Sequence, residues 1–201
     1  MSKGEQTRRR IVERAAGVFN THGYAGTSMG ELTRATGLEK GGIYNHFPSK
    51  EALATAAFDY AVELIGRQFA EAMAAEERAA GKLLAVVQVF EAHVRAPRLP
   101  GGCPVLNTAV ETDDSDSPLR ERARAAMTDW HRMIGRAVKD GMARGELRAD
   151  ISPREVATVM IAALEGGLML SKLYDDPTYL ERVRAHLCAY VASLEENDAK
   201  V

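Results

Sequence analysis

The chain has 201 residues, of which 46% are hydrophobic and 27% are charged, so it can bury a sizeable core in one or two domains. Its first 50 residues hold eight Lys and Arg against four Asp and Glu; since the total charge is −2, the remainder carries −6. A basic head on an acidic body is typical of a polyanion-binding module joined to another module. No apolar leader and no uninterrupted apolar run of about 18 residues is present, so we expect a cytoplasmic protein without a membrane partner.

Apolar residues recur at three- and four-residue spacing along nearly the whole chain, and alternating β-branched runs are absent. The sequence therefore predicts an all-α fold of about nine helices. The first is expected from Thr7 to His22, because Ile11, Ala15 and Phe19 share one face and Gly23 supplies a left-handed stop.

Two short helices are expected next. Ser28 and Glu31 have the spacing of a capping box at the start of the first, and Gly37 ends it. The second runs roughly over residues 39–46, and Phe47 behind it is predicted to be a core aromatic. Two short helices joined by a glycine-containing turn have the proportions of a helix-turn-helix.

A long fourth helix is expected from Lys50, capped by Ser49, to about Ala79. Prolines suited to a first helical turn begin most of the later helices. The remaining helices are predicted over residues 82–94, 104–112, 118–143, 153–174 and 177–194. This pattern divides the chain into a head, residues 1–50, and a helical body, residues 51–201.

Two segments near the N-terminus form a motif: TSMGEL at residues 27–32, and GLEKGGIYNHFPSKEAL at residues 37–53. The Lys-Gly-x-x-Tyr-x-His-Phe-x-x-Lys core of the second resembles the signature of the TetR/AcrR family of transcriptional regulators. The resemblance covers the first quarter of the chain directly. It implies a helix-turn-helix head whose third helix lies in the major groove of double-stranded DNA. It also implies a body that binds an effector and dimerises.

The residue types suit this role on physical grounds. Lys40 and Lys50 supply charge for phosphates, and Gly41 lets the backbone approach a duplex closely. Tyr44 and His46 offer hydrogen bonds from amphipathic rings. These residues would position the head on DNA rather than read its sequence.

By the family's positions, base reading falls to Glu39, Gly42 and Asn45, and asparagine can pair bidentately with adenine for about 1–3 kcal/mol of discrimination. Glu39 and Gly42 depart from the small hydroxyl or alanine residues that are commoner there, and Glu39 can instead cap its helix. Tyr44 can instead be a core aromatic, and Lys50 a solvated cap residue. The predicted DNA-binding residues are Thr27, Ser28, Glu39, Lys40, Gly41, Gly42, Tyr44, Asn45, His46 and Lys50.

A dimer is expected because two heads can read a palindrome in successive major grooves, about 34–36 Å apart. The resemblance places the interface in the last two helices, where small residues permit close approach. Such stripes also form the core of most helices. The predicted interface residues are Val156, Val159, Met160, Ala163, Gly167, Leu170, Leu187, Tyr190 and Leu194.

A small-molecule effector pocket is expected among the central helices, where aromatic and methionine side chains are plausible lining residues, although core packing is the alternative for each. The predicted residues are Phe58, Phe90, His93, Cys103, Asn107, Trp130, Met133 and Met160. Cys103 lies at a predicted helix N-cap, which favours the thiolate and suggests a target for oxidants or electrophiles. A buried, inert thiol is the alternative.

Other classes of protein find little support. Cys103 and Cys188 lie far apart and outside any Cys/His pattern, so neither a disulfide nor a metal site is expected. No metal-binding His/Glu motif, phosphate-binding glycine loop or nucleophile elbow is present, so we expect no catalytic residue and no cofactor. The remaining alternative is a helical dimer that binds a protein partner, or binds DNA without sequence preference.

Overall fold

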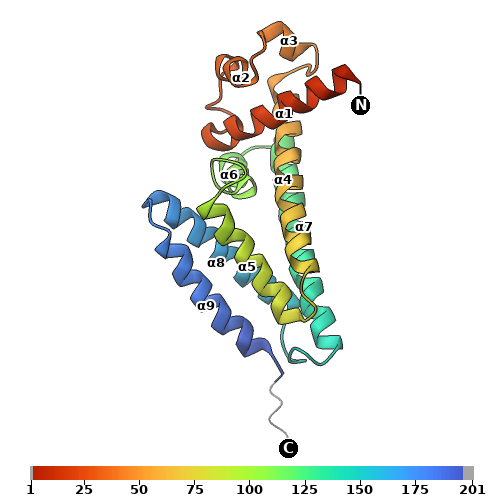
Figure 1. Ribbon diagram of the computed structural model, residues 1–201, viewed down its shortest axis with the longest axis vertical. Helices are drawn as coiled ribbons and strands as arrows, with labels where there is room; N and C mark the ends of the chain where they lie inside the picture. The colour runs from red at the N-terminus through yellow and green to blue at the C-terminus, as the bar shows by residue number, and fades with distance from the viewer. Residues whose placement is uncertain (1, 197–201) are drawn as a thin grey trace, which may run out of the picture. The chain divides into compact units, whose positions relative to one another are not determined.

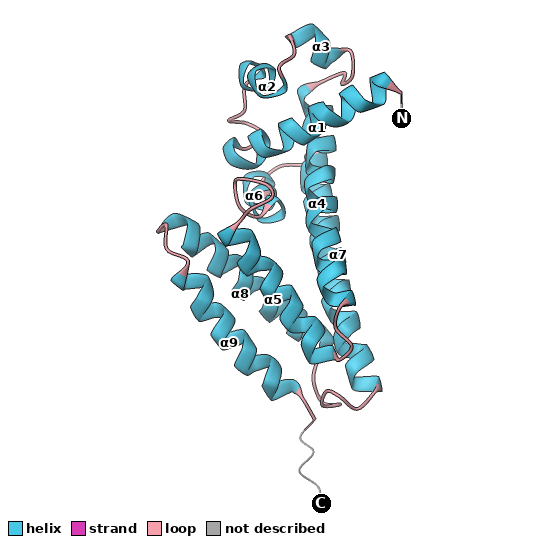
Figure 2. Cartoon of the chain, in the orientation of Figure 1, coloured by secondary structure: helices cyan, strands magenta, loops and turns pink. Residues whose placement is uncertain are grey.

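The computed structural model describes residues 2–196, which form nine α-helices and no β-strand (Figures 1 and 2). The all-α prediction is therefore confirmed. The helices are α1 (Lys3–His22), α2 (Met29–Thr36), α3 (Lys40–Tyr44), α4 (Lys50–Ala74), α5 (Ala79–Arg95), α6 (Pro104–Thr112), α7 (Pro118–Ala143), α8 (Pro153–Leu173) and α9 (Thr178–Leu194).

The chain divides into two compact units. The first comprises the described residues up to Ile65 together with Arg98–Ala126, and the second comprises Gly66–Pro97 and the described residues from Met127 onward. Helices α4 and α7 each continue from one unit into the other. The functional boundary after residue 50 stays a prediction, because the first unit holds the whole predicted head and also α6.

The first unit is built around one apolar cluster. The inward face of α1 contributes Ile11 and Ala15, α2 contributes Leu32, and the α3 segment contributes Ile43 and Phe47. All five side chains are almost fully buried. Phe47 is thus confirmed as a core residue, and its burial orients the opposite face of α3 toward solvent.

Helices α5, α8 and α9 pack on one another in the second unit. Three aromatic rings from α4, α5 and α7 form a cluster: Phe69 lies 5.8 Å from Phe90 and 5.3 Å from Trp130, measured between ring centroids. Phe69 and Trp130 meet edge to face, and such a pair contributes about 0.5–1.5 kcal/mol beyond the burial of its area. In addition, α8 is apolar enough to span a membrane by length and composition, but half of that window is buried inside the protein.

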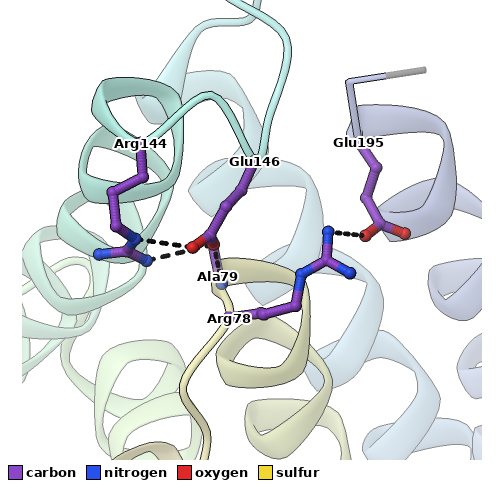
Figure 3. Close-up of polar contacts among 5 residues, drawn as sticks. All are labelled: Arg78, Ala79, Arg144, Glu146 and Glu195. Atoms are coloured by element: carbon purple, nitrogen blue, oxygen red, sulfur yellow. Dashed lines mark hydrogen bonds and ion pairs between the residues drawn. The ribbon is translucent and has the colours of Figure 1, made fainter. Parts of the chain in front are cut away.

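In the second unit, polar contacts connect the start of α5 with the loop after α7 and with the end of α9 (Figure 3). The carboxylate of Glu146, in the loop after α7, accepts hydrogen bonds from Arg144 Nε at 2.7 Å and from the backbone N–H of Ala79 at 2.6 Å. Arg78 forms an ion pair with Glu195 at 3.3 Å. Glu146 therefore attaches the loop after α7 to the N-terminus of α5.

The hydrogen bonds of Glu146 predict that the fold loses stability at acid pH. The Arg144 hydrogen bond, followed by the Ala79 N–H, lowers the pKa of Glu146 from 4.5 to about 2. A carboxyl with a depressed folded-state pKa stabilises the fold above its unfolded pKa, and this contribution is lost as the pH falls through the folded pKa. We expect Glu146→Gln to be less stable than the native protein at pH 7, and the difference to shrink between pH 4.5 and pH 2.

Urea denaturation at several pH values measures this difference. Glu195→Gln is the matched control, because its ion pair with Arg78 is solvent-exposed and contributes little. A Glu146→Gln variant whose stability deficit is the same at pH 7 and at pH 2 would contradict the prediction.

Candidate nucleic-acid interface

Local sequence signals determine both short helices of the head. The Ser28 hydroxyl accepts a hydrogen bond from Glu31 N–H at 3.2 Å, and the Glu31 carboxylate accepts one from Ser28 N–H at 2.7 Å, so the predicted capping box is confirmed. The Ser28 hydrogen bonds also lower the pKa of Glu31. Gly37, at φ 70°, ends α2 in the left-handed conformation and turns the chain into α3.

One face of the α3 segment is open to solvent. Lys40, Gly41, Tyr44 and Asn45 are exposed on it, whereas Ile43 points into the core. These four positions recur at the spacing of one helical face. Tyr44 is 39% exposed, so the alternative of a core aromatic is wrong for this side chain.

Two cations lie at helix starts, where the helix dipole is unfavourable to positive charge. Lys40 is the first residue of α3, and Lys50 is the first residue of α4. The Lys40 ammonium lies 5.8 Å from the ring centroid of Tyr44, and the Lys50 ammonium lies 4.5 Å from that of Tyr24. Each lysine is the first residue of its helix, where the free backbone N–H groups also attract anions.

Gly41 has no internal reason to be a glycine. Its φ is not positive, and a Cβ built on it would meet no atom within 4 Å. A glycine also lowers helix stability by up to about 1 kcal/mol relative to alanine. A glycine at this position would let an external surface approach the backbone closely.

Four other predicted contact residues lie outside this set. Thr27 is only 1% exposed and its hydroxyl donates to the Gly23 carbonyl at 2.6 Å, so its prediction as a DNA contact is wrong for this conformation: the side chain stabilises the turn before α2. Glu39 occupies the N-cap position of α3 but makes no side-chain capping bond. Gly42 and His46 are half-buried.

A network of asparagines fastens the end of α1 to the loop before α6. The Asn20 amide nitrogen donates to the carbonyls of Pro100 at 2.6 Å and Gly102 at 2.8 Å. Asn107 Nδ2 lies 3.0 Å from Asn20 Oδ1 and 2.9 Å from the Gly101 carbonyl. Asn20 is buried, so these bonds satisfy groups that water does not reach.

A second attachment uses Glu111 of α6. One carboxylate oxygen accepts from Tyr24 N–H at 2.9 Å and the other from Ala25 N–H at 2.8 Å. Sequence reasoning did not identify Asn20 or Glu111. An asparagine on the buried face of an amphipathic helix was the available signal for Asn20, whereas nothing local marks Glu111.

Two of the predicted effector residues line a small cavity in the first unit. Its volume is about 30 Å³, room for little more than a water molecule, and Phe58 and Asn107 both line it. Cys103 is the N-cap of α6 as predicted, and Leu106 N–H donates to its Sγ at 3.5 Å. The thiol is 4% exposed, which agrees with the packing alternative; the reactive switch stays a hypothesis.

The other predicted effector residues belong to the second unit. Phe90 and Trp130 are neighbours in the aromatic cluster, with ring centroids 6.2 Å apart. Met160 of α8 is fully buried. His93 of α5 and Met133 of α7 are half-buried. The aromatic and methionine pattern therefore identified core positions, and their role as effector contacts stays a prediction.

The predicted dimer face needs correction. Five of its residues are buried within the single chain, because the stripe on which they lie packs α8 and α9 together and onto α5: Val156, Met160, Gly167, Leu187 and Leu194. A Cβ on Gly167 would lie 2.9 Å from Leu180 Cδ1, so this glycine serves close helix packing inside the subunit. Ala163, Leu170 and Tyr190 are half-buried.

The adjacent face of α8 is apolar and open to solvent. Val159 is 42% exposed, Met169 51% and Leu173 68%. Among the predicted interface residues, only Val159 is exposed.

Comparisons with known proteins agree with this architecture. Residues 11–57 match a family model described as bacterial regulatory proteins, tetR family, and residues 79–187 match one described as tetracyclin repressor-like, C-terminal domain. The chain is 31% identical to the HTH-type transcriptional regulator LmrA of Bacillus subtilis over 85% of this chain and 88% of that protein.

Solved structures give the same result. A TetR transcriptional regulator from Chloroflexus aurantiacus is 45% identical, with a TM-score of 0.93 over 97% of this chain and 98% of that one. The TetR family regulator CifR, described in complex with 26bp double-strand operator DNA, is 26% identical, with a TM-score of 0.74 over 92% of this chain and 93% of that one.

Proposed function

Because the chain belongs to the TetR family and is a helix-turn-helix, DNA-binding transcriptional regulator, we propose that it represses transcription as a cytoplasmic homodimer on a palindromic operator and is released by a small-molecule effector. The observation that carries this proposal is the exposed face of α3. It presents Lys40, Gly41, Tyr44 and Asn45 together, and the protein's own packing gives no reason for Gly41.

Each residue of this face has a role in the proposed complex. Lys40 and Lys50 bind phosphates, Tyr44 donates to the sugar-phosphate backbone, and Gly41 lets α3 approach the floor of the major groove. Asn45 reads a base edge. CifR, a related protein, is described in complex with operator DNA, which supports DNA binding.

A second copy of the chain is proposed to cover the exposed apolar face of α8. Val159, Met169 and Leu173 would expose a contiguous apolar surface on a monomer, and such surfaces mark interaction sites. A two-fold symmetric pairing would also supply the second head that a palindrome requires.

Effector release is proposed to pass through the attachments of α6. Asn107 and Glu111 bind the C-terminal end of α1 and the turn that follows it. A displacement of α6 would therefore pull on the turn that precedes α2. In such a two-state arrangement, effector and DNA oppose each other reciprocally.

Selection from a pool of random duplexes tests the proposed function. We expect the native protein to recover a palindrome with half-sites about 34–36 Å apart. Gly41→Ala is expected to bind the recovered operator at least tenfold more weakly, a difference of about 1.4 kcal/mol, without a lower unfolding temperature.

Gly66→Ala is the matched control. Gly66 is also a helical glycine with no atom within 4 Å of a built Cβ, so its substitution should leave operator binding unchanged. A folded native protein that selects no motif, or binds duplexes of every sequence equally, would instead favour the partner-binding or nonspecific alternative.

A further inference from the structure

We propose that the second unit binds a small polyanion carrying two or more phosphate groups, in a groove between α7 and the N-terminus of α8. The groove has a volume of about 910 Å³, within the range of sites that bind molecules of nucleotide size. This site is distinct from the DNA-reading face of α3, and it does not depend on the proposed effector response.

Positive charge gathers along one face of α7. Arg132, Arg136 and Lys139 follow one another at helical spacing on the groove wall, and His131 lies beside them. Like charges at this spacing destabilise a helix by about 0.2–0.5 kcal/mol per pair. The row therefore does not contribute to the stability of α7.

The start of α8 forms the opposite wall. Ser152 is its N-cap, Pro153 its first residue, and Arg154 places a cation in the first turn, where the helix dipole disfavours it. Gly135 of α7 is buried against this turn, since a Cβ built on it would lie 3.6 Å from the Pro153 carbonyl. Gly135 and Pro153 both line the groove, so α7 and the start of α8 meet there.

The charge of the groove contrasts with that of the body. Residues 51–201 carry a net charge of −6, whereas the groove is lined by four Lys and Arg and by no Asp or Glu. Asp129 forms an ion pair with Arg132 at 3.0 Å, and Asp140 one with Arg136 at 4.0 Å, but both pairs are largely solvent-exposed and weak. Within the described residues no ion pair involves Lys139 or Arg154.

The donor set favours phosphates. Guanidinium groups bind phosphate oxygens bidentately, and three arginines from two helices can engage separate phosphate groups of one ligand. The Ser152 hydroxyl lines the same groove and can donate to a phosphate oxygen, whereas the Thr158 hydroxyl already donates to the Arg154 carbonyl at 2.8 Å. A ligand with a single charge would use only part of this set.

Isothermal titration calorimetry of the full chain tests the proposal, with inorganic tripolyphosphate and ATP as probes at 150 mM KCl. The groove variant is Arg136→Ala/Arg154→Ala. The control is Arg95→Ala/Arg148→Ala, which removes the same charge from two exposed ion pairs outside the groove. We expect saturable 1:1 binding per chain, weakened at least tenfold in the groove variant and unchanged in the control.

Three outcomes would overturn the proposal: no saturable binding by the native protein, equal weakening in both double variants, or binding to sulfate as tight as to tripolyphosphate. Two further measurements address other occupants of the groove. A non-operator duplex that displaces the probe would assign the groove to DNA. A groove variant that sediments as a smaller species than the native protein would assign it to contact between copies of the chain.

Discussion

Replacing Gly101 with alanine is expected to lower the free energy of unfolding by about 2–4 kcal/mol. Gly101 has φ 104°, which L side chains rarely adopt, and a Cβ built on it would overlap the Asn20 carbonyl oxygen. The variant must therefore either overlap a buried backbone atom or displace the loop. Displacement would break the bonds from Asn20 to the Pro100 and Gly102 carbonyls.

Equilibrium urea denaturation measures this loss. Gly145→Ala separates its two causes, because Gly145 also has a positive φ, 69°, but no atom within 4 Å of a built Cβ. We expect the control to lose only about 1–2 kcal/mol, the cost of the left-handed conformation. Equal losses in the two variants would show that the close approach between Gly101 and Asn20 contributes nothing.

Simultaneous replacement of Tyr44 and Lys50 with alanine is expected to weaken operator binding at least 100-fold, which corresponds to about 2.7 kcal/mol. Lys50 holds its charge at the N-terminus of α4, and the exposed Tyr44 lies on the open face of α3. Neither side chain belongs to the buried core of the head. The variant should therefore fold normally, since within the protein it loses only surface contacts such as that between the Lys50 ammonium and the Tyr24 ring.

The salt dependence of binding distinguishes the loss of a phosphate contact from a general loss of DNA affinity. Loss of one phosphate contact per head should reduce the slope of log K against log salt by about one for each half-site. Arg148→Ala is the control, because it removes one positive charge from an exposed pair with Asp150 in the second unit. If the variant binds as tightly as the native protein, α3 is not the DNA-reading helix.

Together the two experiments would distinguish residues that hold the first unit together from residues that contact DNA. Gly101 and Asn20 lie where α1 contacts the loop before α6, and they affect DNA binding through the stability of the fold. Tyr44 and Lys50 are proposed to touch DNA directly. A regulator needs both, because an effector can act on DNA affinity only through contacts that differ between two conformations.

Sequence by itself determined the number and order of the helices and many of their ends, although α1 begins at Lys3 rather than Thr7, α4 ends at Ala74 rather than near Ala79, and α5 begins at Ala79 rather than at residue 82. The bounds of α6 and α7 coincide with the predicted ranges because Pro104 and Pro118 mark their first turns. Ser28, Gly37 and Ser49 likewise set the boundaries of the head, since capping and left-handed turns depend on a few adjacent residues. The DNA-reading motif was visible for the same reason, because its residues are contiguous along the chain.

Tertiary structure alone decided which faces are buried and which distant residues meet. Periodicity defines an apolar stripe but not what covers it, so Val156 and Leu187 were predicted at a dimer face although they pack inside the subunit. Thr27 was predicted to face DNA, but the turn buries it. Asn20 and Glu111 bind backbone groups 80 or more residues away, and local sequence carries no information about partners at that separation.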